Sequence, residues 1–313
     1  MPTTKVDPLP FYTEWAGHPL TDLAKVHSAI QTARPNKPII YLAGDSSLDN
    51  KAWVPSAGPG GEPLPAAVPN IYNSILTTPK PKPDVAFWLN HFLDHKATAL
   101  NTAIEASLLR HRDTTLLPHD DFIRDHIQPK DILIVSIGAN DIALSPTAAT
   151  MRHMLRLAWF TPLSSIERGT ASSLAHFKHM FGEQTKAYIT RLIAKQKPRV
   201  VIVCTIYYPL EGGAGAQPSW ADTQLKALGY GWFPGQLQAA IRKMYEQATS
   251  RNSIEGTTVI PCPLFESLDG KAKEDYVERV EPSVQGGKKM ATHLVRLLGD
   301  FLSESDLVQD PGG

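Results

Sequence analysis

Short runs of apolar and β-branched residues recur along the chain and predict five buried strands. Several of the runs are continuous rather than alternating, which is typical of strands in a parallel sheet that is covered on both faces. They lie at 38–46 (PIIYLAGDS), 97–104 (ATALNTAI), 131–141 (DILIVSIGAND), 199–209 (RVVIVCTIYYP) and 257–265 (TTVIPCPLF).

Between these runs the apolar residues recur at helical spacing. Helices are predicted at 84–95, at 172–197 and at about 283–304. Because strand and helix patterns alternate, the sequence predicts an α/β fold with a doubly wound, mostly parallel five-stranded sheet between two layers of helices. We expect a single domain over residues 1–313, with Pro/Gly-rich surface loops at 56–70 and 77–84.

Two further segments read as cap-like insertions, at about 142–170 and 210–235. Both follow the carboxyl end of a predicted strand, which is where ligands bind in open α/β sheets. We expect their aromatic residues to form an apolar pocket or lid over a hydrophobic ligand, although they could equally close a core between helices. These residues are Trp159, Phe160, Trp232 and Phe233.

Composition excludes few functions. Across 313 residues, Lys and Arg number 31 and so do Asp and Glu, so no basic surplus favours nucleic acid or anionic lipid. No apolar run is long enough to span a membrane, and the first residues lack the apolar region of a secretory signal. We therefore expect a cytosolic protein, in which Cys204 and Cys262 are buried reduced thiols.

Two motifs that end predicted strands could carry chemistry. Gly44-Asp45-Ser46 follows the first strand, where a serine hydroxyl would lie near free backbone N–H groups that favour a negative oxygen. An N-cap serine is the plainer interpretation. Asn140 follows the third strand at the same edge and could donate to a developing oxyanion, although Asn also ends strands for turn reasons alone.

In their order and spacing these motifs resemble the SGNH (GDSL-type) hydrolase family, over most of the chain. GDSS resembles the first block of the family, which implies that Ser46 is the nucleophile. LNTAIEAS (100–107) resembles the second block, with alanines where the family has glycines, and implies that the Ala106 N–H helps to form an oxyanion hole. GAND resembles the third block and implies that Asn140 is the side-chain donor.

The last block departs from the family pattern. The resemblance implies Asp-x-x-His followed by proline, whereas this chain has Glu278-x-x-Glu281-Pro282. Glu281 thus stands where the general base is expected, and Glu278 where its orienting partner is expected. Burial beside Glu278 and Asp45 would raise the pKa of one carboxyl, which could then accept a proton. Arg279, between the glutamates, could partly neutralise them or face solvent.

Other groups could replace or supplement this base. His153 and His176 are the best of the remaining histidines, because they flank the first apolar insertion. Asp45, Glu278 and Glu281 could converge to hold Mg²⁺ or Ca²⁺, but carboxylate clusters are more often solvated, and no Cys/His spacing indicates zinc. No phosphate-binding glycine motif is present, so we expect no cofactor and no metal.

The leading prediction is an enzyme that acts on an ester or acyl group of a small apolar molecule. It would use Ser46 as the nucleophile, the Ser46 and Ala106 N–H groups with Asn140 as the oxyanion hole, and Glu281 with Glu278 as the base. One alternative is a non-hydrolytic enzyme that uses Glu281 as a general acid or base on an apolar metabolite. Another is a pseudoenzyme that binds a lipid-like ligand.

Overall fold

The parallel sheet predicted from the sequence is present, and its strands lie where the apolar runs are. The computed structural model describes residues 5–56, 63–212 and 218–302. The strands pair in the order β2-β1-β3-β4-β5, each parallel to its neighbour, so the predicted fold class is confirmed. Their bounds are β1 (Ile39–Gly44), β2 (Thr98–Asn101), β3 (Ile132–Ser136), β4 (Val200–Thr205) and β5 (Thr258–Pro263).

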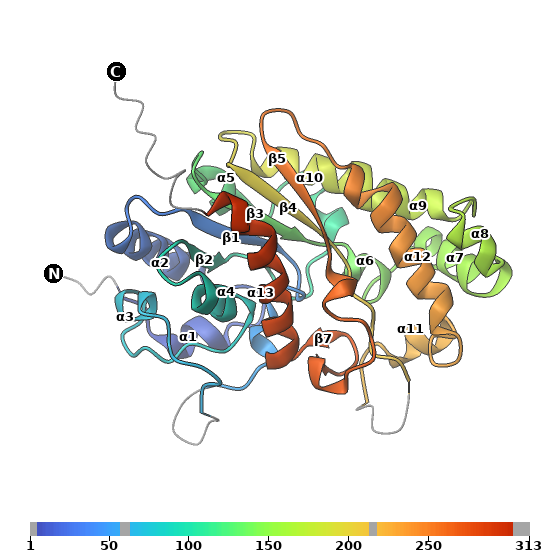
Figure 1. Ribbon diagram of the computed structural model, residues 1–313, viewed down its shortest axis with the longest axis horizontal. Helices are drawn as coiled ribbons and strands as arrows, with labels where there is room; N and C mark the ends of the chain where they lie inside the picture. Colours follow the sequence, from blue (N-terminus) through green and yellow to red (C-terminus); the bar gives the residue numbers. More distant parts are fainter. Residues whose placement is uncertain (1–4, 57–62, 213–217, 303–313) are drawn as a thin grey trace.

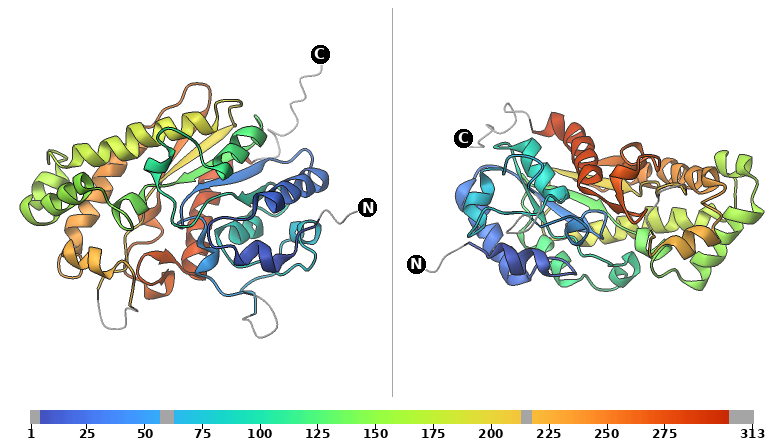
Figure 2. Two further views of the ribbon diagram at one scale, coloured as in Figure 1. Left: turned by 180° about the vertical axis from the view of Figure 1, so that it is seen from behind. Right: turned by 90° about the horizontal axis from the view of Figure 1, so that it is seen from below.

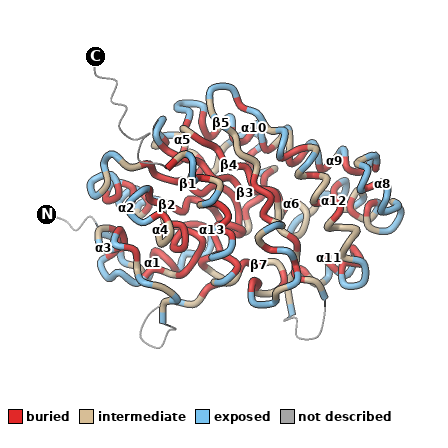
Figure 3. Tube along the Cα trace, in the orientation of Figure 1, coloured by how far each residue is buried: buried red, intermediate tan, exposed pale blue. Residues whose placement is uncertain are grey.

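Helices cover both faces of the sheet (Figures 1 and 2). On one face α4 (Val85–Leu93) packs against α13 (Val284–Leu298). On the other face lie α2 (Leu20–Ala33), α5 (Pro118–His126) and α10 (Thr185–Leu192). Every residue of β1 to β4 is buried between these layers, as Figure 3 shows, which explains why the runs are continuously apolar.

Other predicted elements are confirmed with small changes. The helix predicted at 172–197 consists of α9 (Leu174–Lys178), a π-helical turn (His179–Gln184) and α10. The last predicted helix ends with α13 and a short 3₁₀ turn (Gly299–Phe301), and its positions 303 and 304 lie outside the described residues. The described parts of both Pro-rich stretches are loops, and Cys204 and Cys262 are buried free thiols, as expected.

Some elements were not predicted. The N-terminal part of the chain forms two helices, α1 and α2, and α5 precedes β3. A two-stranded antiparallel ladder, β6 with β7, lies just before α13. The remaining bounds are α1 (Pro8–Thr13), α3 (Ile71–Ile75), α6 (Ala139–Ile142), β6 (Tyr276–Val277) and β7 (Glu281–Pro282).

The two apolar insertions lie together at one end of the molecule, beyond the sheet (Figure 1). The first contains α7 (Ala148–Leu155), a π-helical turn (Arg156–Phe160) and α8 (Leu163–Glu167). The second contains α11 (Asp222–Ala227) and the start of α12 (Pro234–Gln247), while residues 213–217 of that insertion lie outside the described part. Because α12 packs against α8 and the first π-helical turn, the two insertions form one lobe, which we call the cap lobe. No helix in the described part of the chain has the length and apolar character needed to cross a membrane.

The strand order places a crevice at the carboxyl ends of β1 and β3. Connections leave these two neighbours in opposite directions, to β2 on one side and to β4 on the other, so no helix fills the space between their ends. Gly44 closes β1 at a φ of +138°, and a Cβ there would lie 1.7 Å from the Ser136 carbonyl oxygen. A glycine is therefore needed for the close approach of the strand ends that precede Ser46 and Asn140.

Candidate active site

Ser46 lies in the turn that directly follows β1. The turn is held by Asp45, whose Oδ1 accepts hydrogen bonds from the Ser47 N–H at 3.1 Å and the Ser47 hydroxyl at 2.7 Å. Neither the Ser46 nor the Ala106 backbone N–H donates to an acceptor within the described ranges. Ser46 thus stands where a strand ends at free N–H groups, as the sequence indicates.

Glu281 belongs to β7 and is buried, with 2% of its surface exposed. Its Oε1 accepts a hydrogen bond from the Trp220 indole Nε1 at 3.2 Å, while its buried Oε2 has no hydrogen-bond partner among the described residues. The Ser46 side chain lies close enough to this carboxyl to lower its pKa, although the two side chains form no hydrogen bond of standard geometry. Serine and glutamate are therefore adjacent, as the register of the last block predicts.

The Glu281 environment gives its carboxyl an unusual proton affinity. Its pKa is raised to about 7, mainly by burial and also by the nearby Asp45 and Glu278 carboxyls, while the Trp220 hydrogen bond and the Ser46 side chain act to lower it. Burial also raises the pKa of Asp45 to about 6. A carboxyl with a pKa near 7 can both hold and release a proton near neutral pH, as a histidine does.

Asn50 ties the serine turn to the glutamate segment. It lies four residues after Ser46, and its Nδ2 donates to the Pro282 carbonyl oxygen at 3.1 Å. Its Oδ1 accepts from the Val85 N–H at 3.0 Å, at the start of α4. The relative position of Ser46 and Glu281 therefore depends on this buried amide, which the sequence analysis did not identify.

Glu278 does not bond to Glu281 directly. Its Oε2 accepts from the Trp220 backbone N–H at 3.2 Å, and the Trp220 side chain donates to Glu281, so this tryptophan bridges the two carboxyls by hydrogen bonds. Trp220 was missed as a site residue because it lies about sixty positions earlier, in a loop. Arg279 neither neutralises the glutamates nor faces solvent: it is buried and donates to Leu210 O and Asp222.

Asn140 is the second residue of the short helix α6, at the carboxyl edge of the sheet, and lines the same cavity as Ser46 and Glu281. One of its amide hydrogens is donated to the Ser107 carbonyl oxygen at 3.1 Å, which fixes the side chain and leaves the second hydrogen for a ligand. Ala106 has a φ of +57°, in the left-handed region, and is not among the residues that line the cavity.

The left-handed conformation of Ala106 costs free energy, because its Cβ approaches the following carbonyl. Replacing Ala106 with glycine should therefore raise the free energy of unfolding by about 0.5–1 kcal/mol, measured by urea denaturation. Ala103, which is buried and has no positive φ, is the matched control, and Ala103→Gly should lower the same quantity. Equal losses in both variants would contradict a strained backbone at Ala106.

The cavity runs from the polar group at the sheet edge into the cap lobe. Its polar end holds Asp45, Ser46, Asn140, Trp220 and Glu281. Its walls are otherwise mostly aliphatic and come from both insertions and from the segment after β4. They include Ile142, Met154, Leu157, Phe177, Ile206, Leu225, Leu228, Leu237, Ile241 and Met244. One cavity thus joins a polar end at the sheet edge to apolar walls in the cap lobe.

The four aromatic residues predicted to line this cavity lie outside it. Trp159, Phe160, Trp232 and Phe233 are 47%, 81%, 64% and 66% exposed, so the expectation that they form its walls is wrong. The cavity-facing positions of the same segments hold smaller or aliphatic side chains such as Ala158. A role in contacting substrate stays a prediction for these four residues.

The candidate replacement histidines also lie outside the cavity. His153 and His176 stack on each other with ring centroids 4.8 Å apart, and His176 Nε2 is 3.0 Å from the Thr150 hydroxyl. No histidine is among the residues found to line the cavity in the described part of the chain. The carboxyl groups that share the cavity with Ser46 are those of Asp45 and Glu281.

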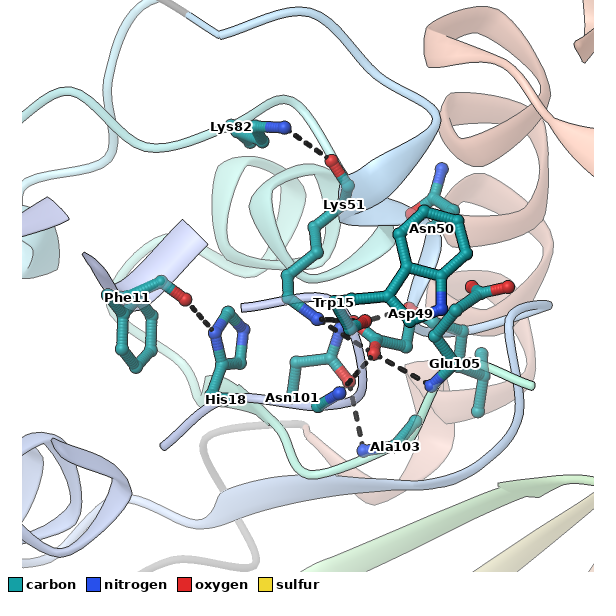
Figure 4. Close-up of polar contacts among 12 residues, drawn as sticks. Phe11, Trp15, His18, Asp49, Asn50, Lys51, Lys82, Asn101, Ala103 and Glu105 are labelled. Carbon is teal, nitrogen blue, oxygen red and sulfur yellow. Dashed lines mark hydrogen bonds and ion pairs between the residues drawn. The ribbon is translucent and has the colours of Figure 1, made fainter. Parts of the chain in front are cut away.

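A buried ion pair supports the loops around Ser46, and Figure 4 shows it in detail. Lys51 Nζ lies 2.8 Å from Asp49, and both side chains are fully buried. Asp49 Oδ2 also accepts from the Glu105 N–H at 3.0 Å, next to Ala106. Burial, with the Glu281 charge second, raises the pKa of Glu105 to about 9. Glu105 is thus a protonated neighbour of Glu281 near neutral pH.

No group of three or more His, Cys, Asp or Glu side chains in the described ranges is arranged to hold a metal ion. Asp45 and Glu281 do lie near each other. Asp45 is engaged with Ser47, however, and Glu278 points to the Trp220 backbone, so the three carboxylates do not converge. The three carboxylates are thus directed to different hydrogen-bond partners.

Comparison with known proteins finds no matching family model and no matching curated protein. Similar folds occur among solved structures. A carbohydrate acetylesterase from Sinorhizobium meliloti is 11% identical over 84% of this chain and 99% of that one, with a TM-score of 0.44. An inhibitor-bound aryl esterase from M. smegmatis is 13% identical over 85% of this chain and 100% of that one, with a TM-score of 0.45.

A protein from Bacillus subtilis is 17% identical over 84% of this chain, with a TM-score of 0.43, and the chain spans only 56% of its length. At these identities and TM-scores the likeness carries no argument about function.

Proposed function

We propose that this chain is a serine hydrolase that cleaves esters of small apolar molecules, with Ser46 as the nucleophile and Glu281 as the proton acceptor. One observation carries the proposal: the Ser46 hydroxyl lies beside a buried glutamate whose pKa is raised to about 7, at the polar end of an apolar cavity. A solvated glutamate would be too weak a base for a serine hydroxyl. Burial makes the Glu281 carboxylate a stronger base, because it raises the pKa of the group.

The reaction would proceed in two halves. Ser46 Oγ attacks the ester carbonyl carbon while its proton passes to Glu281, and the carbonyl oxygen becomes an oxyanion. Collapse of this intermediate expels the alcohol, which takes the proton from Glu281, and leaves an acyl group on Ser46. Water then attacks the acyl-enzyme, gives a proton to Glu281, and releases the acid as Ser46 recovers the proton.

The oxyanion would be stabilised by donors that are already in place. The second amide hydrogen of Asn140 and the free Ser46 N–H lie at the cavity, and the Ala106 N–H is a third donor carried over from the family resemblance. Fixed donors of this kind contribute roughly 100- to 1,000-fold in rate each, because they need no reorganisation when the charge forms.

A fluorophosphonate probe tests the proposal without knowledge of the substrate. The adduct should be on Ser46 by mass spectrometry, because the probe reports an activated serine. Hydrolysis of p-nitrophenyl esters should then rise from acetate to decanoate, since longer chains fill more of the apolar cavity. A folded sample that gives no adduct, and hydrolyses no ester of the series, would contradict a serine hydrolase.

Trp220→Phe should shift the pH dependence of catalysis. The indole N–H stabilises the Glu281 carboxylate, so its loss raises the pKa of that carboxyl and leaves less of the base form at low pH. We expect kcat/KM at about pH 6 to fall roughly three- to tenfold, with little change at high pH. Trp15→Phe, on the N-terminal segment, is the matched control. An unshifted profile for Trp220→Phe would show that Glu281 is not the titrating base.

A second candidate function follows from the free Glu281 oxygen. Because Oε2 has no partner in the described structure and the cavity is apolar, Glu281 could exchange a proton directly with a bound apolar metabolite, in an isomerisation or elimination. Under this alternative Glu281→Gln would abolish turnover while Ser46→Ala would have little effect. The pair of variants therefore distinguishes the two functions.

A further inference from the structure

The outer surface of the cap lobe carries a concentration of exposed apolar side chains. Nine large hydrophobic residues are exposed in the described part of the chain, and five of them lie on only two short segments. We call these five the aromatic patch: Trp159, Phe160, Leu163, Trp232 and Phe233. Exposed aromatics grouped in this way usually mark a surface that contacts something else.

The two segments of the patch lie side by side. The Trp159 Nε1 donates to the Ala227 carbonyl oxygen at 2.8 Å, and its ring lies against Gly229. The Gln236 amide donates to Leu157 O at 3.0 Å and to Thr161 O at 2.6 Å. These bonds join the π-helical turn of the first insertion to the start of α12. The two segments that carry the patch are therefore neighbours on the cap lobe.

Most of the charged side chains around the patch are basic. Residues 142–166 contain Arg152, His153 and Arg156, and residues 223–241 contain Lys226, with no Asp or Glu in either range. Arg152, Arg156 and Lys226 are exposed. The flanking carboxylates are Asp222, which pairs with Arg279, and Glu167, which is followed by Arg168. A chain with no net charge therefore presents more cations than carboxylates beside its exposed aromatic rings.

We propose that the aromatic patch docks the protein on the surface of an anionic lipid bilayer. Aromatic rings partition into the interfacial region of a membrane, and neighbouring Arg and Lys bind anionic head groups. The same segments that expose the patch turn Leu157, Ala158 and Leu228 into the cavity, so docking would bring the cavity close to an apolar phase. The inference goes beyond ester hydrolysis and does not require it.

Vesicle co-sedimentation tests the docking directly. The intact protein should bind vesicles of phosphatidylcholine mixed with phosphatidylglycerol more tightly than vesicles of phosphatidylcholine alone. The triple variant Phe160→Ser, Trp232→Ser and Phe233→Ser should lose about 100- to 1,000-fold in partition coefficient, since each exposed ring contributes roughly five- to tenfold. Arg152→Glu with Arg156→Glu should remove the preference for the mixed vesicles.

The matched control is Leu9→Ser with Leu20→Ser, which removes two exposed leucines on α1 and α2, at the opposite end of the molecule (Figure 1). These variants should bind vesicles as the unchanged protein does. Ser46→Ala should also bind normally, which separates docking from hydrolysis. Absence of vesicle binding, or equal binding by the triple variant, would overturn the proposal. So would a concentration-dependent dimer that the triple variant abolishes, because the patch would then bind a second copy.

Discussion

Replacing Ser46 with alanine should eliminate fluorophosphonate labelling and lower ester hydrolysis by at least about 1,000-fold. Alanine removes the oxygen that would form the acyl-enzyme, and the neighbouring Ser47 hydroxyl is engaged with Asp45 and Ser136. The loss should be in kcat, while KM changes little, because the apolar walls that hold the substrate remain. The measurements are the labelled fraction by mass spectrometry and the steady-state rates on the best ester of the chain-length series.

Ser164→Ala is the control, since Ser164 is an exposed serine on α8 and should keep full labelling and rate. Removal of the Ser46 hydroxyl is a small change, and the turn is held by Asp45 and Ser47 rather than by Ser46. Ser46→Ala should therefore unfold at the same urea concentration as the unchanged protein. Hydrolysis that persists in Ser46→Ala would rule out a serine nucleophile and favour direct action of Glu281.

The strands of the sheet could be predicted because burial on both faces requires continuous runs of apolar residues in the sequence. Strands β1 to β4 are enclosed by helices on both faces, so nearly every position in them is apolar and the runs stand out. The N-terminal helix α2 was missed although it is amphipathic, because its polar face and histidine resemble a solvated loop. Helix α5 has few apolar residues, so its sequence shows no clear helical periodicity. Its position depends on contacts with residues that are distant in the sequence.

The site could be predicted in part, for a topological reason. Ser46 and Asn140 each follow a parallel strand, and the carboxyl ends of adjacent parallel strands meet at one edge. Glu281 could be placed only from the register of Pro282 and Gly286. The partner of its carboxyl could not be found, because Trp220 reaches Glu281 from a loop whose path the sequence does not specify.

The sequence pattern did not predict which side chains of the cap lobe face the cavity. An apolar insertion beside a site indicates that some of its side chains face a ligand, but not which ones. The π-helical turn at Arg156–Phe160 changes the helical period, so Leu157 and Ala158 face the cavity while Trp159 and Phe160 point outward. Side-chain direction after such a turn depends on the backbone, and the spacing of residues does not determine it.

Replacing Glu281 with glutamine should lower hydrolysis by about 1,000-fold or more and remove the pH dependence that the unchanged protein shows. Glutamine keeps the shape of the side chain and can still accept from Trp220, but it cannot accept a proton. In the unchanged protein the base form accumulates as pH rises, so kcat/KM should increase through a pKa of about 7 and then level off. A pH–rate profile of both proteins on one ester measures this directly.

Glu281→Gln should make the protein more stable although it lowers the rate of hydrolysis. The folded pKa of Glu281 is raised above its unfolded value near 4.5, so its ionisation weakens the fold as pH rises from about 4.5 through about 7. Glu281→Gln removes this loss and should raise the free energy of unfolding by about 2 kcal/mol at about pH 8. Glu274→Gln, an exposed glutamate seven residues earlier, should change neither quantity. A glutamate that acts as a proton acceptor from a buried position lowers the stability of the folded protein. If Glu281→Gln changed neither the stability nor the rate, Glu281 would have no part in the mechanism.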